Sequence, residues 1–352
     1  MINKITDILY NESKNHYHLY DCDHFEINDF YNDDIKKTEK AISIIKKIIT
    51  KNGKQDLYQY LLRLSIVESA TIEILPYQRD HVIHALNTFL LGVYINEKYL
   101  DRIAKKVNYF QWKLACLFHD IGYQLEITNN LIIEFQKNIN LVNDKLDINY
   151  SHLDFFSIKT SKNLIDLNDG KNSLILIQKK INDWGLLINV KKEFNNKSKK
   201  GIICHGIISS LLILKTLDGL YHKNNPDRKH EPIIHDNIDY NQTYFEDDIV
   251  SACSSIFIHN LKKDSFLKKK INPFKMPLVF LLKISDTLQE WERPNNKLEN
   301  GNSPYCFSIK IEDKKIIFET EIPELITKLT EEINDFFEVE FIEIKLKIAN
   351  NG

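Results

Sequence analysis

The sequence has little of what several common function classes require. Its 352 residues include only 10 glycines and no GxxxxGK[ST] run, which excludes the phosphate-binding loop of P-loop nucleotide hydrolases. Five cysteines are present, an odd number, and none are spaced as CxxC: Cys22, Cys116, Cys204, Cys253 and Cys306. Cys116, Cys204 and Cys253 lie in apolar helical runs, where reduced core cysteines are expected. No cysteine pattern for a structural zinc site is present.

Strong charge and long apolar runs are also missing. The formal net charge is −2 and the lysines are spread along the chain, so no electrostatic footprint for DNA or RNA is present. The longest apolar run, near Ile202 to Leu214, contains His205 and two serines and is too short to span a bilayer. The N-terminus lacks the apolar core of a signal peptide. We expect a cytoplasmic protein that binds neither nucleic acid nor membrane.

What the sequence does contain is a set of histidines and aspartates within strongly apolar segments. The pair His119-Asp120 ends the run LACLFHD, whose Leu117 and Phe118 favour burial. Burying two adjacent polar side chains costs free energy unless something satisfies them, and one metal ion satisfies both. Four more candidate metal ligands lie within similarly apolar segments: His84, His205, His259 and Asp286. The set indicates a divalent metal centre, and Asp286 among leucines and isoleucines needs a cation in particular.

In order and context these six residues resemble the HD superfamily of metal-dependent phosphohydrolases, over roughly residues 76 to 295. That family has a lone His, a later His-Asp pair and a distant Asp on a last helix, which here are His84, His119-Asp120 and Asp286. Its two-metal branches add two histidines in between, and His205 and His259 are similar in order. The resemblance implies a mainly α-helical bundle that hydrolyses a phosphate ester or anhydride, most often of a nucleotide.

The resemblance also implies roles for the site residues. Nitrogen and oxygen ligands suit one or two ions of Mn, Fe, Co, Ni or Zn. Asp120 would bridge two ions, and His81, one helical turn before His84, is the candidate proton donor to the leaving group. Arg79, Lys262 and Lys283 are candidates for binding the substrate phosphate, with solvent-exposed cations as the alternative for each.

Two subtypes of hydrolase remain open. A two-metal site with all six ligands is similar to cyclic (di)nucleotide phosphodiesterases, although Asn260 stands where the cyclic-dinucleotide branch has a second His and its GYP motif is absent. A one-metal site with His84, His119, Asp120 and Asp286 is similar to deoxynucleotide triphosphohydrolases and nucleotidases. Outside hydrolysis, a di-iron oxygenase with the same ligand set and a catalytically idle nucleotide sensor are the alternatives.

The apolar spacing predicts the domain organisation. Residues 1–75 would be an N-terminal segment packed on the core, with a loosely structured arm at 1–33 and helices at 34–53 and 57–74. The HD-type domain would span 76–295, with helices at 79–98 and 110–121, Gly122 as the cap of the second, and Pro277 and Pro294 bounding the Asp286 helix.

Two insertions, near 124–200 and 221–245, interrupt that domain. The first would hold short helices around 131–142 and 174–184 and the polar loop KKEFNNKSKK, and helices would then start near His205 and run from Asp247 to His259. The second carries another dipeptide, His235-Asp236, in a Pro- and Asn-containing stretch without helical period, which predicts a loop and not a ligand.

Residues 303–350 alternate apolar and polar side chains and then show a helical period, which predicts a small β-β-α-β module. Its single apolar face must pack on the helical body or on another subunit, so a homo-oligomer formed through this module is possible. The substrate partner we expect is a small nucleotide.

Overall fold

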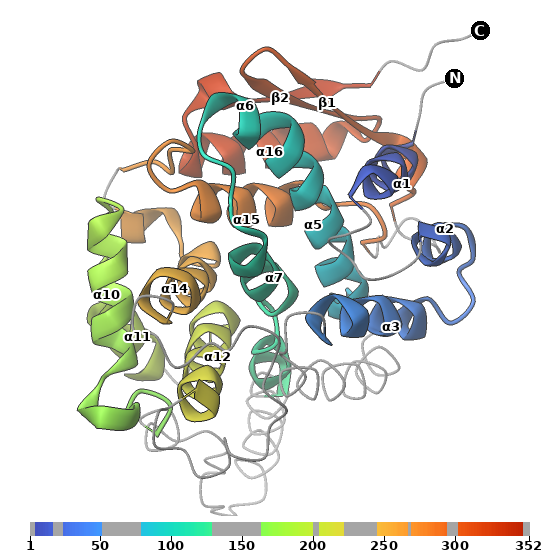
Figure 1. Ribbon diagram of the computed structural model, residues 1–352. Coiled ribbons are helices and arrows are strands. Elements are labelled where there is room, and N and C mark those ends of the chain that lie inside the picture. The colour runs from blue at the N-terminus through green and yellow to red at the C-terminus, as the bar shows by residue number, and fades with distance from the viewer. Residues whose placement is uncertain are drawn as a thin grey trace, which may run out of the picture. The chain divides into compact units, whose positions relative to one another are not determined.

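The computed structural model describes residues 4–16, 24–50, 79–128, 163–199, 204–221, 245–266, 269–293 and 302–347. Within these ranges the chain is mainly helical, with a small sheet near the C-terminus (Figure 1). The described residues form two compact units. Unit 1 holds the residues up to Phe118 and from Lys262 onward, and unit 2 holds those from His119 to Leu261.

Unit 1 is built around α5, a helix buried on nearly all sides because its sequence, HVIHALNTFLLGVYI, is apolar in every direction. The Asp80 side chain caps it by accepting hydrogen bonds from the backbone N–H groups of Val82 and Ile83. Helices α3, α7 and α15 pack against α5. The helices of unit 1 are α1 (Ile5–Asn15), α2 (His24–Asn32), α3 (Lys37–Thr50), α5 (His81–Ile95, continued by a π-helical turn at Asn96–Leu100), α6 (Asp101–Ile103), α7 (Tyr109–Leu117), α15 (Pro277–Leu288) and α16 (Pro323–Phe336), with 3-10 turns at Lys263–Phe266, Pro304–Cys306 and Val339–Phe341.

The C-terminal part of unit 1 has the predicted β-β-α-β order, which the structure confirms. Strands β1 (Phe307–Glu312) and β2 (Lys315–Thr320) pair antiparallel, and β3 (Ile342–Leu346) pairs parallel to β2. The module packs on α15 through α16, and the Phe280 ring lies against those of Phe337 and Tyr99. Its apolar face is therefore covered within unit 1.

Unit 2 has α12 and α14 as its closest helix pair (Figure 1). Small side chains allow this close packing: the Ser210 hydroxyl donates to the Cys253 carbonyl at 2.7 Å, and a Cβ on Gly206 would lie 2.8 Å from the His259 ring. The helices of unit 2 are α10 (Ser173–Asp183), α11 (Val190–Lys199), α12 (His205–Tyr221) and α14 (Val250–His259, preceded by a π-helical turn at Phe245–Ile249), with a 3-10 turn at Asn168–Gly170.

Several helices follow the sequence prediction closely. The helices predicted at 34–53, 79–98, 174–184 and near His205 are confirmed as α3, α5, α10 and α12, and that from Asp247 to His259 as the π-helical turn and α14. Pro277 is the first residue of α15, as predicted, but that helix ends at Leu288, well before Pro294. The helices predicted at 57–74 and 131–142, most of the second insertion, Pro294 and His235-Asp236 lie outside the described residues.

Two predictions for polar segments were wrong. The arm at 1–33 contains α1 and α2, which bury apolar side chains one turn apart, such as Ile5 with Leu9 and Ile27 with Phe30. The segment KKEFNNKSKK belongs largely to α11, anchored by Phe194. In each case a few apolar residues at helical spacing outweigh a polar composition.

Two broader expectations can be checked on the described residues. Cys116, Cys204 and Cys253 are buried free thiols, as predicted for reduced core cysteines. No helix in the described ranges is long and apolar enough to cross a membrane.

Candidate metal centre

Three side chains of unit 2 converge at the ends of their segments. Asp120 lies in the turn at residues 118–122 that follows α7, His205 is the first residue of α12 and His259 is the last of α14. The Asp120 Oδ1 atom is 3.3 Å from His205 Nε2 and 3.6 Å from His259 Nε2. Asp120 and His259 are buried, and the His205 side chain is 14% exposed. These residues form a group that can hold a metal ion.

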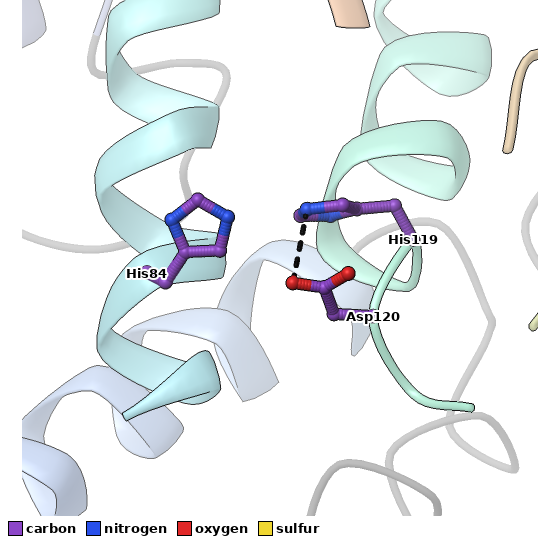
Figure 2. Close-up of side chains that lie close together, drawn as sticks. All are labelled: His84, His119 and Asp120. Atoms are coloured by element: carbon purple, nitrogen blue, oxygen red, sulfur yellow. Dashed lines mark ion pairs between the residues drawn. The ribbon is translucent and has the colours of Figure 1, made fainter. Parts of the chain in front are cut away.

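The second oxygen of the same carboxylate faces a different histidine. Asp120 Oδ2 is 3.3 Å from His119 Nε2, the ion pair drawn as a dashed line in Figure 2. His119 is fully buried, and its ring lies edge-on to that of His259, with 5.1 Å between the centroids. Asp120 thus presents Oδ1 to His205 and His259 and Oδ2 to His119, an arrangement in which one carboxylate can serve two ions.

Hydrogen bonds fix which nitrogen each ring turns toward Asp120. His259 Nδ1 lies 2.5 Å from the Ile256 carbonyl oxygen, which can only accept, so Nδ1 carries the proton and Nε2 presents its lone pair. His205 Nδ1 lies 2.8 Å from the Glu126 carboxylate, which also accepts from the His205 backbone N–H at 2.8 Å. A histidine whose other nitrogen bonds a carboxylate or a carbonyl is typical of metal ligands.

The same contacts shift two pKa values in the absence of a metal. Burial alone lowers the pKa of His205, but the hydrogen bond that it donates to Glu126 and the Asp120 charge outweigh burial and raise that pKa above its usual value of 6.5. Burial raises the pKa of Glu126, but its bonds with His205 outweigh this and lower the pKa below 4.5. The pair therefore has opposite charges over a wide pH range.

The spacing of donor atoms also fits a metal ion. Ligand atoms bound at about 2.0–2.2 Å in tetrahedral or octahedral geometry lie about 2.8–3.6 Å from one another. The separations from Asp120 to His119, His205 and His259 are 3.3, 3.3 and 3.6 Å. His259 Nε2 and Asp120 Oδ1, which are 3.6 Å apart, do not make a hydrogen bond, because neither atom carries a proton. The residues present therefore fit a divalent metal with nitrogen and oxygen ligands.

Unit 1 brings together a second pair of predicted ligands, His84 on α5 and Asp286 on α15. His84 Nε2 is 3.1 Å from Asp286 Oδ1, again within the range of neighbouring ligands. His84 Nδ1 lies 2.5 Å from the Gln289 side-chain oxygen, whose amide nitrogen donates to the Trp291 carbonyl. Because the amide is oriented in this way, Nδ1 carries the proton and Nε2 presents its lone pair.

Arg79 lies beside this pair. One guanidinium nitrogen donates to His84 Nε2 at 3.1 Å and is 3.9 Å from Asp286 Oδ1. The other donates to the backbone and side-chain oxygens of Gln289 at 2.5 and 2.6 Å. The guanidinium group is thus held next to two predicted metal ligands.

The other predicted site residues differ in their positions. His81 is buried on α5, with its ring edge-on to His84 and 6.5 Å between the centroids. The ammonium group of Lys283 donates to Glu332 of α16 at 3.0 Å and lies over the Phe336 ring, so Lys283 links α15 to the C-terminal module. Lys262 is an exposed residue after α14.

Sequence reasoning missed the residues that orient the histidines. Glu126 was one acidic residue in the run IGYQLEITN, and Gln289 followed an apolar helix without any motif of its own. A polar side chain in apolar surroundings was the only available signal, and it does not say which histidine would be the partner.

Comparisons with protein-family models, with curated proteins and with solved structures find no match to this chain. The site is therefore interpreted from its own residues.

Proposed function

We propose that this chain is a metal-dependent phosphohydrolase whose metal centre is the unit 2 group of Asp120, His205 and His259, with the His84–Asp286 pair of unit 1 as a second candidate for metal binding. The observation that carries the proposal is the Asp120 carboxylate, which turns Oδ1 toward His205 and His259 and Oδ2 toward His119. That arrangement favours two ions sharing one carboxylate.

A bound ion would supply an acidified water near neutral pH and would polarise a phosphoryl oxygen. The protein residues supply the rest. Gln289, Glu126 and the Ile256 carbonyl orient three imidazoles so that Nδ1 is bonded and Nε2 carries the lone pair for a metal. Arg79 would neutralise the anionic phosphate, and His81, buried one turn from His84, would protonate the leaving oxygen.

The substrate class rests on the family resemblance, which favours a nucleotide. Both subtypes, the cyclic (di)nucleotide phosphodiesterase and the triphosphohydrolase or nucleotidase, remain within the proposal. The two carboxylate oxygens of Asp120, which face different histidines, favour a centre with two ions. Asn260 does not replace the additional histidine of the cyclic-dinucleotide branch. Asn260 instead donates through its amide toward the Cys204 sulfur at 3.6 Å, beside His205.

The test is a phosphate-release screen on the purified chain with nucleoside mono-, di- and triphosphates and cyclic nucleotides. Mn, Fe, Co, Ni, Zn and Mg are each supplied in turn, and Asp120→Asn, which keeps the side-chain shape, is the control. We expect phosphate or nucleotide release with a transition metal and none from the variant. Release that is equal in the parent and Asp120→Asn would refute the proposal. Oxygen consumption with iron and no phosphate release would indicate the di-iron oxygenase.

A further inference from the structure

Unit 1 contains a pocket of about 280 Å³ that is lined in part by His84. Its walls come from the start of α3, the start of α5 and the segment after α15. The side chains that matter for recognition are Lys37, Arg79, His84, Gln289, Trp291 and Glu292. A group esterified to a phosphate held near Arg79 could extend into this pocket.

The far side of the pocket is built from a fixed ion pair. Lys37 Nζ lies 2.6 Å from Glu292 Oε1, and both side chains are mostly buried. The second oxygen of Glu292 accepts from the Asn87 amide at 3.0 Å. Glu292 also adopts a positive φ of 61°, which costs a non-glycine residue free energy. Such strain, when the surroundings hold it in place, is often found at binding sites.

The pocket wall also contains a hydrogen-bond donor without an acceptor. The Trp291 side chain is fully buried, and the described residues offer no partner for its indole Nε1–H. Buried polar groups are nearly always satisfied, by protein, by water or by a ligand. The indole N–H is enclosed by the protein within the wall of the pocket.

The charges of the lining indicate what kind of ligand fits. Three carboxylates, of Asp34, Asp80 and Glu292, face two cations, of Lys37 and Arg79, so the lining has no excess positive charge. Arg79 is already assigned to the phosphate on the ligand side, and Lys37 is neutralised by Glu292. A second phosphate would meet a lining with more carboxylates than cations, whereas a hydroxyl group can donate to Glu292 and accept from Lys37.

We infer that this pocket binds an uncharged, hydroxyl-rich part of the substrate, such as a sugar ring, and excludes a second phosphate group. The inference rests on the proposed function only for the phosphate itself. It favours sugar monophosphates and nucleoside monophosphates over triphosphates and cyclic dinucleotides.

Binding to the pocket can be tested without metal or catalysis. Saturation-transfer NMR on the full-length, metal-free protein would use D-ribose and D-glucose as probes. We expect transfer to at least one sugar, with a dissociation constant about tenfold higher in Glu292→Gln, because a hydrogen bond to a charged group is lost. Glu39→Gln, the same change at an exposed position of α3, should bind as the parent does. No transfer to either sugar, or equal transfer in Glu292→Gln, would overturn the inference.

Kinetics then test the link to the reaction, with ribose 5-phosphate, phenyl phosphate and the pair fructose 6-phosphate and fructose 1,6-bisphosphate. In Glu292→Gln we expect KM for ribose 5-phosphate to rise about tenfold and KM for phenyl phosphate to stay unchanged. An equal loss for both substrates, or a parent preference for the bisphosphate, would contradict the inference. If no compound releases phosphate, the proposed function fails, and the NMR result alone decides whether the pocket binds sugars.

Discussion

At the scale of single residues, three histidines reach the same orientation through three different oxygens. His84 uses the Gln289 amide, His205 the Glu126 carboxylate and His259 the Ile256 backbone carbonyl. In each case Nδ1 is bonded and Nε2 is presented as a ligand. A carboxylate raises the basicity of its histidine more than an amide or a carbonyl does, so we expect His205 to be the strongest nitrogen donor of the three.

The stoichiometry of the centre tests the two-ion arrangement. A parent protein with two ions should have a metal-to-protein ratio of about two. His205→Ala and His259→Ala each remove a ligand on the Oδ1 side of Asp120, so each should lower the ratio toward about one. Asp120→Ala should lose both ions. Elemental analysis of the parent and the three variants measures this, and a parent ratio of about one that neither histidine variant changes would support a single ion.

The pH dependence of stability tests the Glu126–His205 pair in metal-free protein. The raised pKa of His205 stabilises the fold fully below pH 6.5 and ceases to do so as the pH rises through the folded value. The lowered pKa of Glu126 stabilises the fold above pH 4.5 and ceases to do so as the pH falls through the folded value. The pair should therefore contribute most between pH 4.5 and 6.5.

Glu126→Gln keeps the shape of the side chain and removes its charge. We expect it to lower the free energy of unfolding by about 1 kcal/mol in that window, a value reduced for partial exposure, and by much less at pH 9. Urea unfolding in the presence of a chelator measures this, with Glu193→Gln on α11 as the control. A loss that is the same at both pH values would show that the charge of Glu126 does not matter.

At the scale of elements, the ligands sit where segments begin or end, and glycines permit the close contacts between those segments. Gly122 lies in the turn that holds Asp120, and its N–H donates to the Ser209 hydroxyl of α12 at 2.8 Å. A Cβ on Gly122 would lie 2.6 Å from the His205 carbonyl oxygen, closer than real contacts allow. Gly122 is therefore needed for close approach to α12. It is not the helix cap that the sequence predicted, because α7 ends at Leu117 and Phe118 is its C-terminal cap.

Gly206 has the same role between α12 and His259. We expect Gly206→Ala to displace the His259 ring and to weaken metal binding by at least about tenfold, the usual effect of a perturbed metal shell. Gly219→Ala is the matched control, because it lies on the same helix with open space around it. That variant should keep its metal affinity and gain up to about 1 kcal/mol of stability from helix propensity. Metal titration and thermal unfolding measure both effects, and an unchanged affinity in Gly206→Ala would contradict this role.

The sequence was sufficient for elements with a strong apolar period and for ligands in apolar surroundings. It predicted α5, α12, α15 and the β-β-α-β module, and it selected Asp120, His205 and His259 before their proximity was known. It failed for α11, where Val190 and Phe194 anchor an otherwise polar helix, and for Glu126, whose partner is 79 positions away along the chain. Pairing across such a distance depends on packing, which composition and periodicity do not contain.

At the scale of the whole molecule, the predicted ligands are divided between the two units. His84 and Asp286 belong to unit 1, and His119, Asp120, His205 and His259 belong to unit 2. The C-terminal module belongs to unit 1, where Lys283 and Lys328 form ion pairs that join α15 and its following segment to α16. Because the apolar face of the module is covered there, the fold does not require a second subunit, and a homo-oligomer stays a prediction.

A metal ion bound by the unit 2 group should stabilise the helices that carry its ligands. A ligand at about 100 times its dissociation constant stabilises the state that binds it by about 2.7 kcal/mol. Hydrogen–deuterium exchange with and without Mn should therefore slow in α12 and α14 of unit 2. Asp120→Asn should lose this slowing, because it removes the charge of the carboxylate that lies between His205 and His259. Exchange in α12 and α14 that Mn leaves unchanged in the parent protein would mean that Asp120, His205 and His259 do not hold a metal ion.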